Sequence, residues 1–107
     1  MHPKRKNKNK FKAKVFNALS DSVRLEILEF LRDGEKCVCE ITPHVGIVQP
    51  LVSRHLKILK DCGVVKHRKD GNRRLYSVTD QAIFRIIDLV TTDLADELSK
   101  RVIEQIV

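Results

Sequence analysis

The chain has 107 residues, with 21 Lys or Arg, 14 Asp or Glu and a formal net charge of +7. This length suits one compact domain whose modest core would be completed by pairing with a second copy. No apolar run is long enough to span a membrane, and the N-terminal residues lack the apolar core of a signal peptide. We therefore expect a cytoplasmic protein without a membrane partner.

Positive charge is concentrated in two segments. Residues 1–14 contain seven bases and no acid, and residues 53–75 contain eight bases but only two acids. From residue 15 onward the 14 bases and 14 acids cancel. Localised positive charge on an otherwise neutral chain indicates a polyanionic partner. The alternative is a basic surface that contacts only solvent.

The N-terminal third predicts a basic arm followed by two helices. Residues 1–10 are mostly Lys, Arg and Asn, and we expect a disordered arm there, ahead of a domain over residues 11–107. A first helix is predicted by four apolar residues at helical spacing, Phe11, Val15, Ala18 and Leu19. Ser20 or Asp21 would cap a second helix that ends near Gly34. The apolar stripe of this second helix is Val23, Ile27, Phe30 and Leu31.

The middle of the chain predicts two more helices joined by a tight turn. The first is short and covers about residues 39–45, and the second begins in "VQPLVSRHLKILKD" with Pro50 in its first turn. Three residues of the second helix should face the core, Val52, Leu56 and Leu59. Five polar or basic residues fall on its opposite side, Gln49, Ser53, Arg54, Lys57 and Lys60.

A basic hairpin and a long helix complete the prediction. "VVKHRKDGNRRLYSV" contains two extended runs around Asp70-Gly71-Asn72, a strong signal for a β-hairpin. The basic residues near its tip are Arg68, Lys69, Arg73 and Arg74. After Thr79 we expect one long helix with an apolar seam of Ile83, Ile87, Val90, Leu94, Leu98, Val102 and Ile106. This seam is longer than a small domain can cover, so we interpret it as a dimer interface.

These elements predict a mainly α fold with a small β-hairpin, a winged helix-turn-helix that dimerises through its terminal helices. A helix fits the DNA major groove, where Gln can pair bidentately with adenine and Arg with guanine. A two-fold dimer would place two such helices on a palindromic duplex. The residues expected to contact DNA are Gln49, Ser53, Arg54, Lys57, Lys60, Arg68, Lys69, Arg73 and Arg74.

Cys37 and Cys39 lie one residue apart, just before the short third helix. In an extended segment residues i and i+2 share a side, so both sulfurs could reach one soft ion. Soft thiolates favour Cd(II), Zn(II), Pb(II), Cu(I) and As(III) over hard ions. Two ligands are too few for a closed zinc or cadmium site. Two alternatives remain open: the thiols pack as small apolar groups, or they act in redox chemistry.

Four stretches, "KVFNALSDSVRLEILEFL", "CVCEI", "VQPLVSRHLKILKDCGVV" and "KDGNRRLYSVTD", resemble the ArsR/SmtB family over about residues 13–107. The resemblance implies a homodimeric winged-helix repressor that leaves its operator when it binds a metal or metalloid. "EKCVCEI" is similar to the family's arsenic- and cadmium-type sensing motif, with Cys37 and Cys39 as ligands.

The sequence departs from the family pattern at several positions. Val48 replaces a serine that usually caps the recognition helix, and Thr42 stands where arsenic-type members often carry a third cysteine. The arm has no cysteine, and His2 is its one candidate ligand; His44 lies downstream of the pair. The last helix has no histidine, so we expect the family's other metal site to be absent.

The sequence therefore predicts a sequence-specific DNA-binding transcriptional repressor that is de-repressed by As(III), Cd(II), Zn(II) or another soft metal at Cys37 and Cys39. The alternative is a winged-helix repressor without a metal effector, whose cysteines are inert or redox-sensing. A protein–protein adaptor that does not bind DNA is a further rival. We expect no enzymatic activity, because no positioned base or oxyanion site accompanies a nucleophile.

Overall fold

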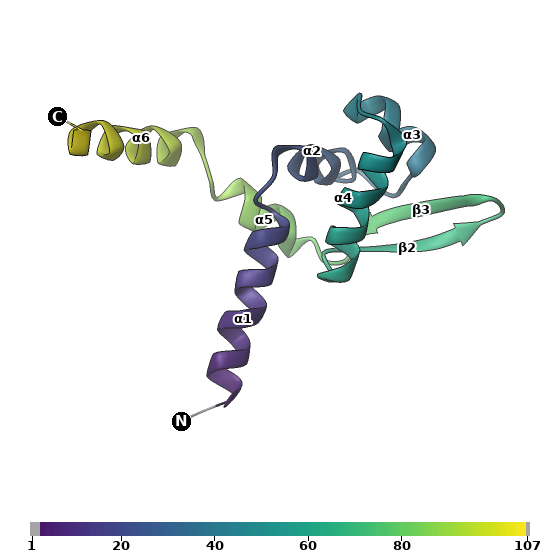
Figure 1. Cartoon of the computed structure of the whole chain (residues 1–107), viewed down its shortest axis with the longest axis horizontal. Helices are drawn as coiled ribbons and strands as arrows, with labels where there is room; N and C mark the ends of the chain where they lie inside the picture. The colour runs from purple at the N-terminus through teal and green to yellow at the C-terminus, as the bar shows by residue number, and fades with distance from the viewer. Residues whose placement is uncertain (1–2, 107) are drawn as a thin grey trace.

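The computed structural model describes residues 3–106, with side chains from residue 7 onward. Its elements are α1 (Pro3–Ala18), α2 (Ser22–Phe30), β1 (Lys36–Cys37), α3 (Val38–Val45), α4 (Gln49–Asp61), β2 (Val65–Asp70), β3 (Arg73–Val78), α5 (Ala82–Asp88) and α6 (Thr92–Ile106). Helices α2, α3 and α4 gather beside the β2–β3 hairpin, while α1 and α6 project away in different directions (Figure 1). None of the described helices is long and apolar enough to cross a bilayer.

The core lies between the three central helices and the base of the hairpin. Helix α4 buries Val52, Leu56 and Leu59 completely, each with 0% exposure, which confirms the predicted apolar side. Ile27 of α2 and Ile41 of α3 are also fully buried and belong to the same cluster of packed side chains. Burying these side chains fixes the rotation of α4 about its own axis and turns its other side outward.

Asp21 is the N-cap of α2, as the sequence predicts. Its Oδ2 accepts hydrogen bonds from the backbone N–H groups of Val23 (2.9 Å) and Arg24 (3.1 Å). These bonds, that of Arg24 first, hold the pKa of Asp21 below its ordinary value because they stabilise the carboxylate form.

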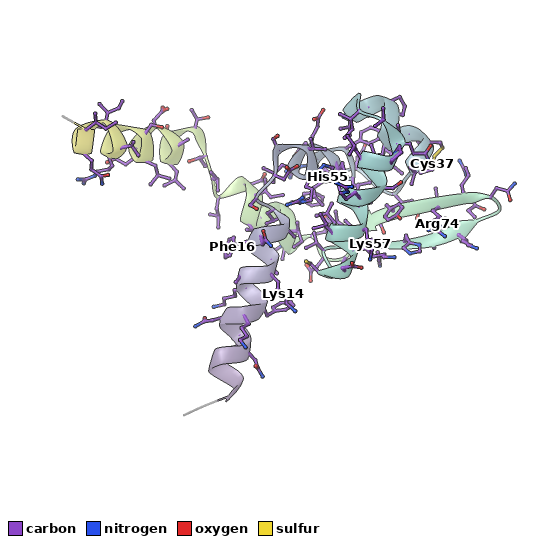
Figure 2. All side chains as sticks on the ribbon, viewed as in Figure 1. Lys14, Phe16, Cys37, His55, Lys57 and Arg74 are labelled. Atoms are coloured by element: carbon purple, nitrogen blue, oxygen red, sulfur yellow. A yellow bond between two sulfur atoms is a disulfide. The ribbon has the colours of Figure 1, made fainter. Side chains whose placement is uncertain are left out.

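The Arg24 guanidinium joins three helices. It donates to the backbone oxygen of Ala18 at the end of α1 (2.7 Å), and its Nη1 lies 3.3 Å from Nδ1 of His55 on α4. His55 therefore acts as a packing and hydrogen-bonding residue between the helices. Figure 2 shows its ring where α4 meets α2.

The predicted hairpin is present and belongs to a three-stranded antiparallel sheet in the order β1-β3-β2. Asp70 pairs with Arg73 across a two-residue turn, in which Gly71 has a φ of +62° and Asn72 keeps a negative φ. A glycine at the first turn position suits the type II′ hairpin turn. Strand β1 was not predicted, because two residues are too few to show an alternating pattern.

The predicted single C-terminal helix is wrong: the chain forms α5 and α6, which are separate helices. The break falls at residues 89–91, where the hydroxyl oxygen of Thr91 accepts a hydrogen bond from the N–H of Leu94 (3.1 Å) and so caps α6. The predicted apolar seam of residues 83–106 is therefore split between the two helices. Ile83 and Ile87 pack against the core, whereas the apolar residues of α6 are exposed.

The N-terminal arm also differs from the prediction, because α1 continues through residues 3–10, where we expected disorder. Lys is a good helix former, and no Gly or further Pro follows Pro3 before the end of α1. The helix that starts near Phe11 can therefore extend toward the N-terminus. His2 lies outside the described residues.

Val48 caps α4 without a side-chain hydrogen bond, and it is 63% exposed. Its backbone is already extended (φ −66°, ψ 146°), which is the conformation that a serine cap adopts. We predict that Val48→Ser stabilises the fold by about 1 kcal/mol, because the hydroxyl would accept a hydrogen bond from the first turn. Urea unfolding at fixed protein concentration measures this difference.

Val48→Ala is the matched control for this substitution, because it removes the same apolar surface without adding an acceptor. A gain of stability as large as that of Val48→Ser would contradict the capping explanation.

Candidate nucleic-acid interface and cysteine pair

Helix α4 and the hairpin form the two walls of an open groove of about 440 Å³. Its lining residues are Val38, Gln49, Ser53, Lys57, Lys60, Asn72, Arg74 and Tyr76. Figure 2 shows Lys57 on α4 and Arg74 on the hairpin, the two walls of the groove. The structure thus brings together five of the nine residues predicted to contact DNA. It adds Val38, Asn72 and Tyr76, which were not among the predicted DNA contacts because only the polar side of the helix and the bases of the hairpin were assigned to DNA.

Arg54 lies on α4 but does not line this groove. Successive residues of a helix are 100° apart, so Arg54 points away from the side of α4 that faces the hairpin, on which Ser53 and Lys57 lie. The side chain is exposed and forms no ion pair within the described part of the chain. Arg54 therefore presents a free guanidinium on the outermost side of α4.

The strand register divides the four predicted hairpin bases between two faces. Lys69 lies directly opposite Arg74, and Asp70 lies directly opposite Arg73. Because side chains alternate between faces along a strand, Lys69 and Arg74 share the face of Tyr76, which lines the groove. Arg68 and Arg73 fall on the other face. We did not predict this division, because all four bases lie around the same turn and the strand register was unknown.

The two bases on the far face are paired with acids. Arg68 makes a bidentate contact with Glu35, with nitrogen–oxygen distances of 2.6 Å and 3.1 Å. Arg73 pairs with Asp70 at 3.1 Å. The Arg68 guanidinium holds the pKa of Glu35 below its ordinary value, because it hydrogen-bonds the carboxylate form.

The bases on the groove side differ in whether they are paired with a carboxylate. Lys57 is paired with Asp61 at 2.8 Å and lowers the pKa of that carboxyl. Among the described residues Lys60, Lys69 and Arg74 form no ion pair with a carboxylate. Like charges directly opposite each other in a sheet repel, as Lys69 and Arg74 do. An anion bound between them would relieve this repulsion.

The two cysteines lie at the junction of β1 and α3. Cys37 is the last residue of β1 and the N-cap of α3, and Cys39 is in the first turn of that helix. Their Cα atoms are 5.1 Å apart and their sulfur atoms form a disulfide. We expected both residues in an extended segment. Only Cys37 is extended (φ −80°, ψ 160°), and the sulfurs meet because the chain turns into the helix after it.

The pair supplies two sulfur ligands and no closed metal site. Within residues 3–106 no group of three or more His, Cys, Asp or Glu side chains is placed to hold a metal ion. The ring of His44 stacks on that of Phe30 with 3.8 Å between the centroids. When reduced, Cys37 and Cys39 could hold a soft ion such as As(III), with the remaining ligands supplied from elsewhere.

The two thiols differ in their access to solvent. Cys37 is 1% exposed, whereas Cys39 is exposed. We predict that iodoacetamide alkylates Cys39 much faster than Cys37 in the reduced folded protein, because the reagent must reach the sulfur. Peptide mass spectrometry over a time course measures both rates. Equal rates in the folded protein would contradict the burial of Cys37, and equal rates in urea are the control.

Comparison with known proteins agrees with this architecture. Residues 21–67 match the profile of the bacterial regulatory protein, arsR family. A probable mercury resistance operon repressor of Streptomyces lividans is 47% identical over 78 residues, which is 73% of this chain but only 60% of that protein. An arsenical resistance operon repressor of Staphylococcus aureus is 42% identical over 73 residues, covering 68% of this chain and 70% of that protein.

A solved structure shows the same fold. The homodimeric winged helix-turn-helix DNA-binding domain of Mb0332 from Mycobacterium bovis superposes with a TM-score of 0.80 at 30% identity. That match covers 94% of this chain and 93% of the other. Helices α3 and α4 are therefore the helix-turn-helix, and the β2–β3 hairpin is the wing. The chain belongs to the ArsR family of winged helix-turn-helix transcriptional regulators.

Proposed function

We propose that the protein is a sequence-specific, DNA-binding repressor whose affinity for its operator falls when a soft metal ion or As(III) binds Cys37 and Cys39. The observation that carries this proposal is the groove between α4 and the wing. Its walls carry polar side chains that suit base edges, and two of its cations, Lys60 and Arg74, have no carboxylate partner within the described part of the chain. A duplex supplies both the base edges and the phosphates that such a groove requires.

Different residues in and beside the groove would contact the bases and the phosphates of DNA. Gln49 and Ser53, at the N-terminal end of α4, would meet base edges in the major groove, and Arg54 would do so from the outer side. Lys60, Lys69 and Arg74 would hold phosphates, which sets the register and most of the affinity. Lys57, Arg68 and Arg73 are already paired with carboxylates, so they would contribute less unless those pairs open.

The terminal helices support a two-fold dimer. Several apolar side chains on α1 and α6 are more than half exposed, namely Phe11, Phe16, Leu98, Val102, Ile103 and Ile106. A second copy would cover this surface, and the Mycobacterium bovis relative is homodimeric. Two copies related by a two-fold axis would place their α4 helices about 34 Å apart on a palindromic operator. Such a protein works where the chromosome is, in the cytoplasm.

The effector is inferred from the sulfur pair and from the relatives. The relatives include a probable mercury resistance operon repressor, an arsenical resistance operon repressor and a cadmium resistance transcriptional regulatory protein. A soft ion binds thiolates in preference to hard oxygen ligands. De-repression requires only that the ion bind the DNA-free conformation more tightly than the DNA-bound one. Redox control of the same pair is the second candidate, because the two sulfurs are close enough to form a disulfide.

We predict that As(III) or Cd(II) weakens operator binding by the reduced protein about 5- to 150-fold, the range typical of allosteric coupling. Cys37→Ser should abolish this response, because one thiolate is lost from a two-sulfur site. Fluorescence anisotropy of a labelled operator measures the affinity with and without each ion. Cys62→Ser is the matched control and should respond as the wild type does.

Equal binding of both ions by the wild type and by Cys37→Ser would overturn the metal proposal. Release of the operator by a thiol oxidant, with no response to either ion, would instead identify the redox alternative.

We predict that Arg74→Ala weakens binding to all duplexes alike, because its guanidinium would hold phosphate and not a base. The slope of log affinity against log salt concentration should fall in magnitude by about one. Arg73→Ala is the matched control. It removes the same charge from the adjacent residue, but that guanidinium is paired with Asp70 on the other face of the wing. A slope change as large for Arg73→Ala would contradict the assignment of faces.

A further inference from the structure

Strand β1 attaches the cysteine pair to the wing. Lys36 pairs with Tyr76 and Cys37 pairs with Leu75, so β1 forms the edge of the wing sheet beside β3. Leu75 lies between Arg74 and Tyr76, which both line the groove. The buried cysteine is thus one strand away from the wing wall of the candidate DNA interface.

A second attachment reaches across the sheet to β2. Glu35, two residues before Cys37, makes its bidentate contact with Arg68, which is opposite Leu75 on the far side of β3. The segment that carries Cys37 is therefore tied to both strands of the wing, by backbone pairing to β3 and by an ion pair to β2. The other ion pair of the wing, Asp70–Arg73, joins residues of the turn to each other and does not involve this segment.

The residue between the two cysteines lies in the groove itself. Val38 belongs to the groove lining, together with Gln49 and Ser53 of α4 and with Arg74 of β3. The two sulfurs are bonded to each other in this structure, so an ion bound between them would hold them farther apart. We expect this separation to move the backbone at Val38 or at its neighbours. Because β1 has only two residues, its pairing to β3 offers little resistance to such a movement.

We infer that the effector acts first on the wing, through β1 and the Glu35–Arg68 pair, and that Glu35 is a positioning residue for de-repression. This inference rests on the proposed function. Ligation of Cys37 and Cys39 would shift β1 along or away from β3, and Glu35 would carry β2 with it. The wing would then turn relative to α4 and withdraw Arg74 from the phosphate that it holds. A route through the packing of α3 against α4 is the competing explanation, and it needs neither Glu35 nor β1.

The test compares Glu35→Gln with Asp70→Asn. Each substitution neutralises one carboxylate that pairs with a wing arginine, and only the first breaks the link to the cysteine segment. Operator affinity is measured by anisotropy for each reduced protein, with and without As(III). For each protein we compare the ratio of operator affinity without As(III) to operator affinity with As(III). A substitution that changes DNA binding equally in both conditions leaves this ratio unchanged.

We expect the As(III)-dependent ratio to fall at least about threefold in Glu35→Gln and to stay at the wild-type value in Asp70→Asn. Amide hydrogen exchange supplies an independent readout. As(III) should change exchange within residues 65–78 of the wild type and of Asp70→Asn, and change it less in Glu35→Gln.

The outcomes separate the two proposals. A wild type whose operator affinity does not respond to As(III) overturns the proposed effector and this inference together. A wild type that responds, with equal ratios for both variants, overturns only the role of Glu35 and the wing route. Exchange changes confined to residues 38–61, in α3 and α4, would also overturn the wing route while leaving the effector in place.

Discussion

The burial of three side chains on one side of α4 is the constraint on which the rest of the structure depends. Val52, Leu56 and Leu59 are fully enclosed by the core, so α4 cannot rotate without exposing them to water. This fixed rotation puts Gln49, Ser53 and Lys60 along the edge that faces the wing. The wing is in turn held by its strand pairing and by Val65 and Val78 at its buried base. Two rigid walls therefore face each other across the groove.

Ion pairing decides which face of the wing keeps unpaired positive charge, and the backbone fold alone does not decide this. The chain has bases on both faces of the wing. Within residues 7–106, acids pair with the bases of the far face alone, where Glu35 and Asp70 lie beside Arg68 and Arg73. The groove face keeps Lys69 and Arg74 directly opposite each other without such a partner among the described residues. Exposed ion pairs of this kind contribute little to stability. Their importance is that they leave the unbalanced positive charge on the side where a phosphate backbone could lie.

Much of the fold and part of the site could be predicted from the sequence. The stripe of α4, the Asp21 cap and the hairpin turn depend on local spacing and local hydrogen bonds, which a sequence displays directly. The break after α5 was missed because Val90 and Leu94 keep the helical period across it. The break is set by the hydrogen bond that caps α6 at Thr91 and by the packing of Ile83 and Ile87 on the core. The spacing of apolar residues indicates neither of these. Strand β1 and the division of the wing bases depend on strand register, a tertiary property that no single segment carries.

The disulfide at the start of α3 encloses a loop with only one intervening residue. Cross-links stabilise a protein mainly by restricting its unfolded chain, and the restriction grows with the length of chain enclosed. So short a ring restricts the unfolded chain very little. This disulfide should therefore raise the melting temperature less than a cross-link that enclosed a longer loop. The fold around the sulfur pair therefore depends on the packing of Cys37 and its neighbours more than on the cross-link.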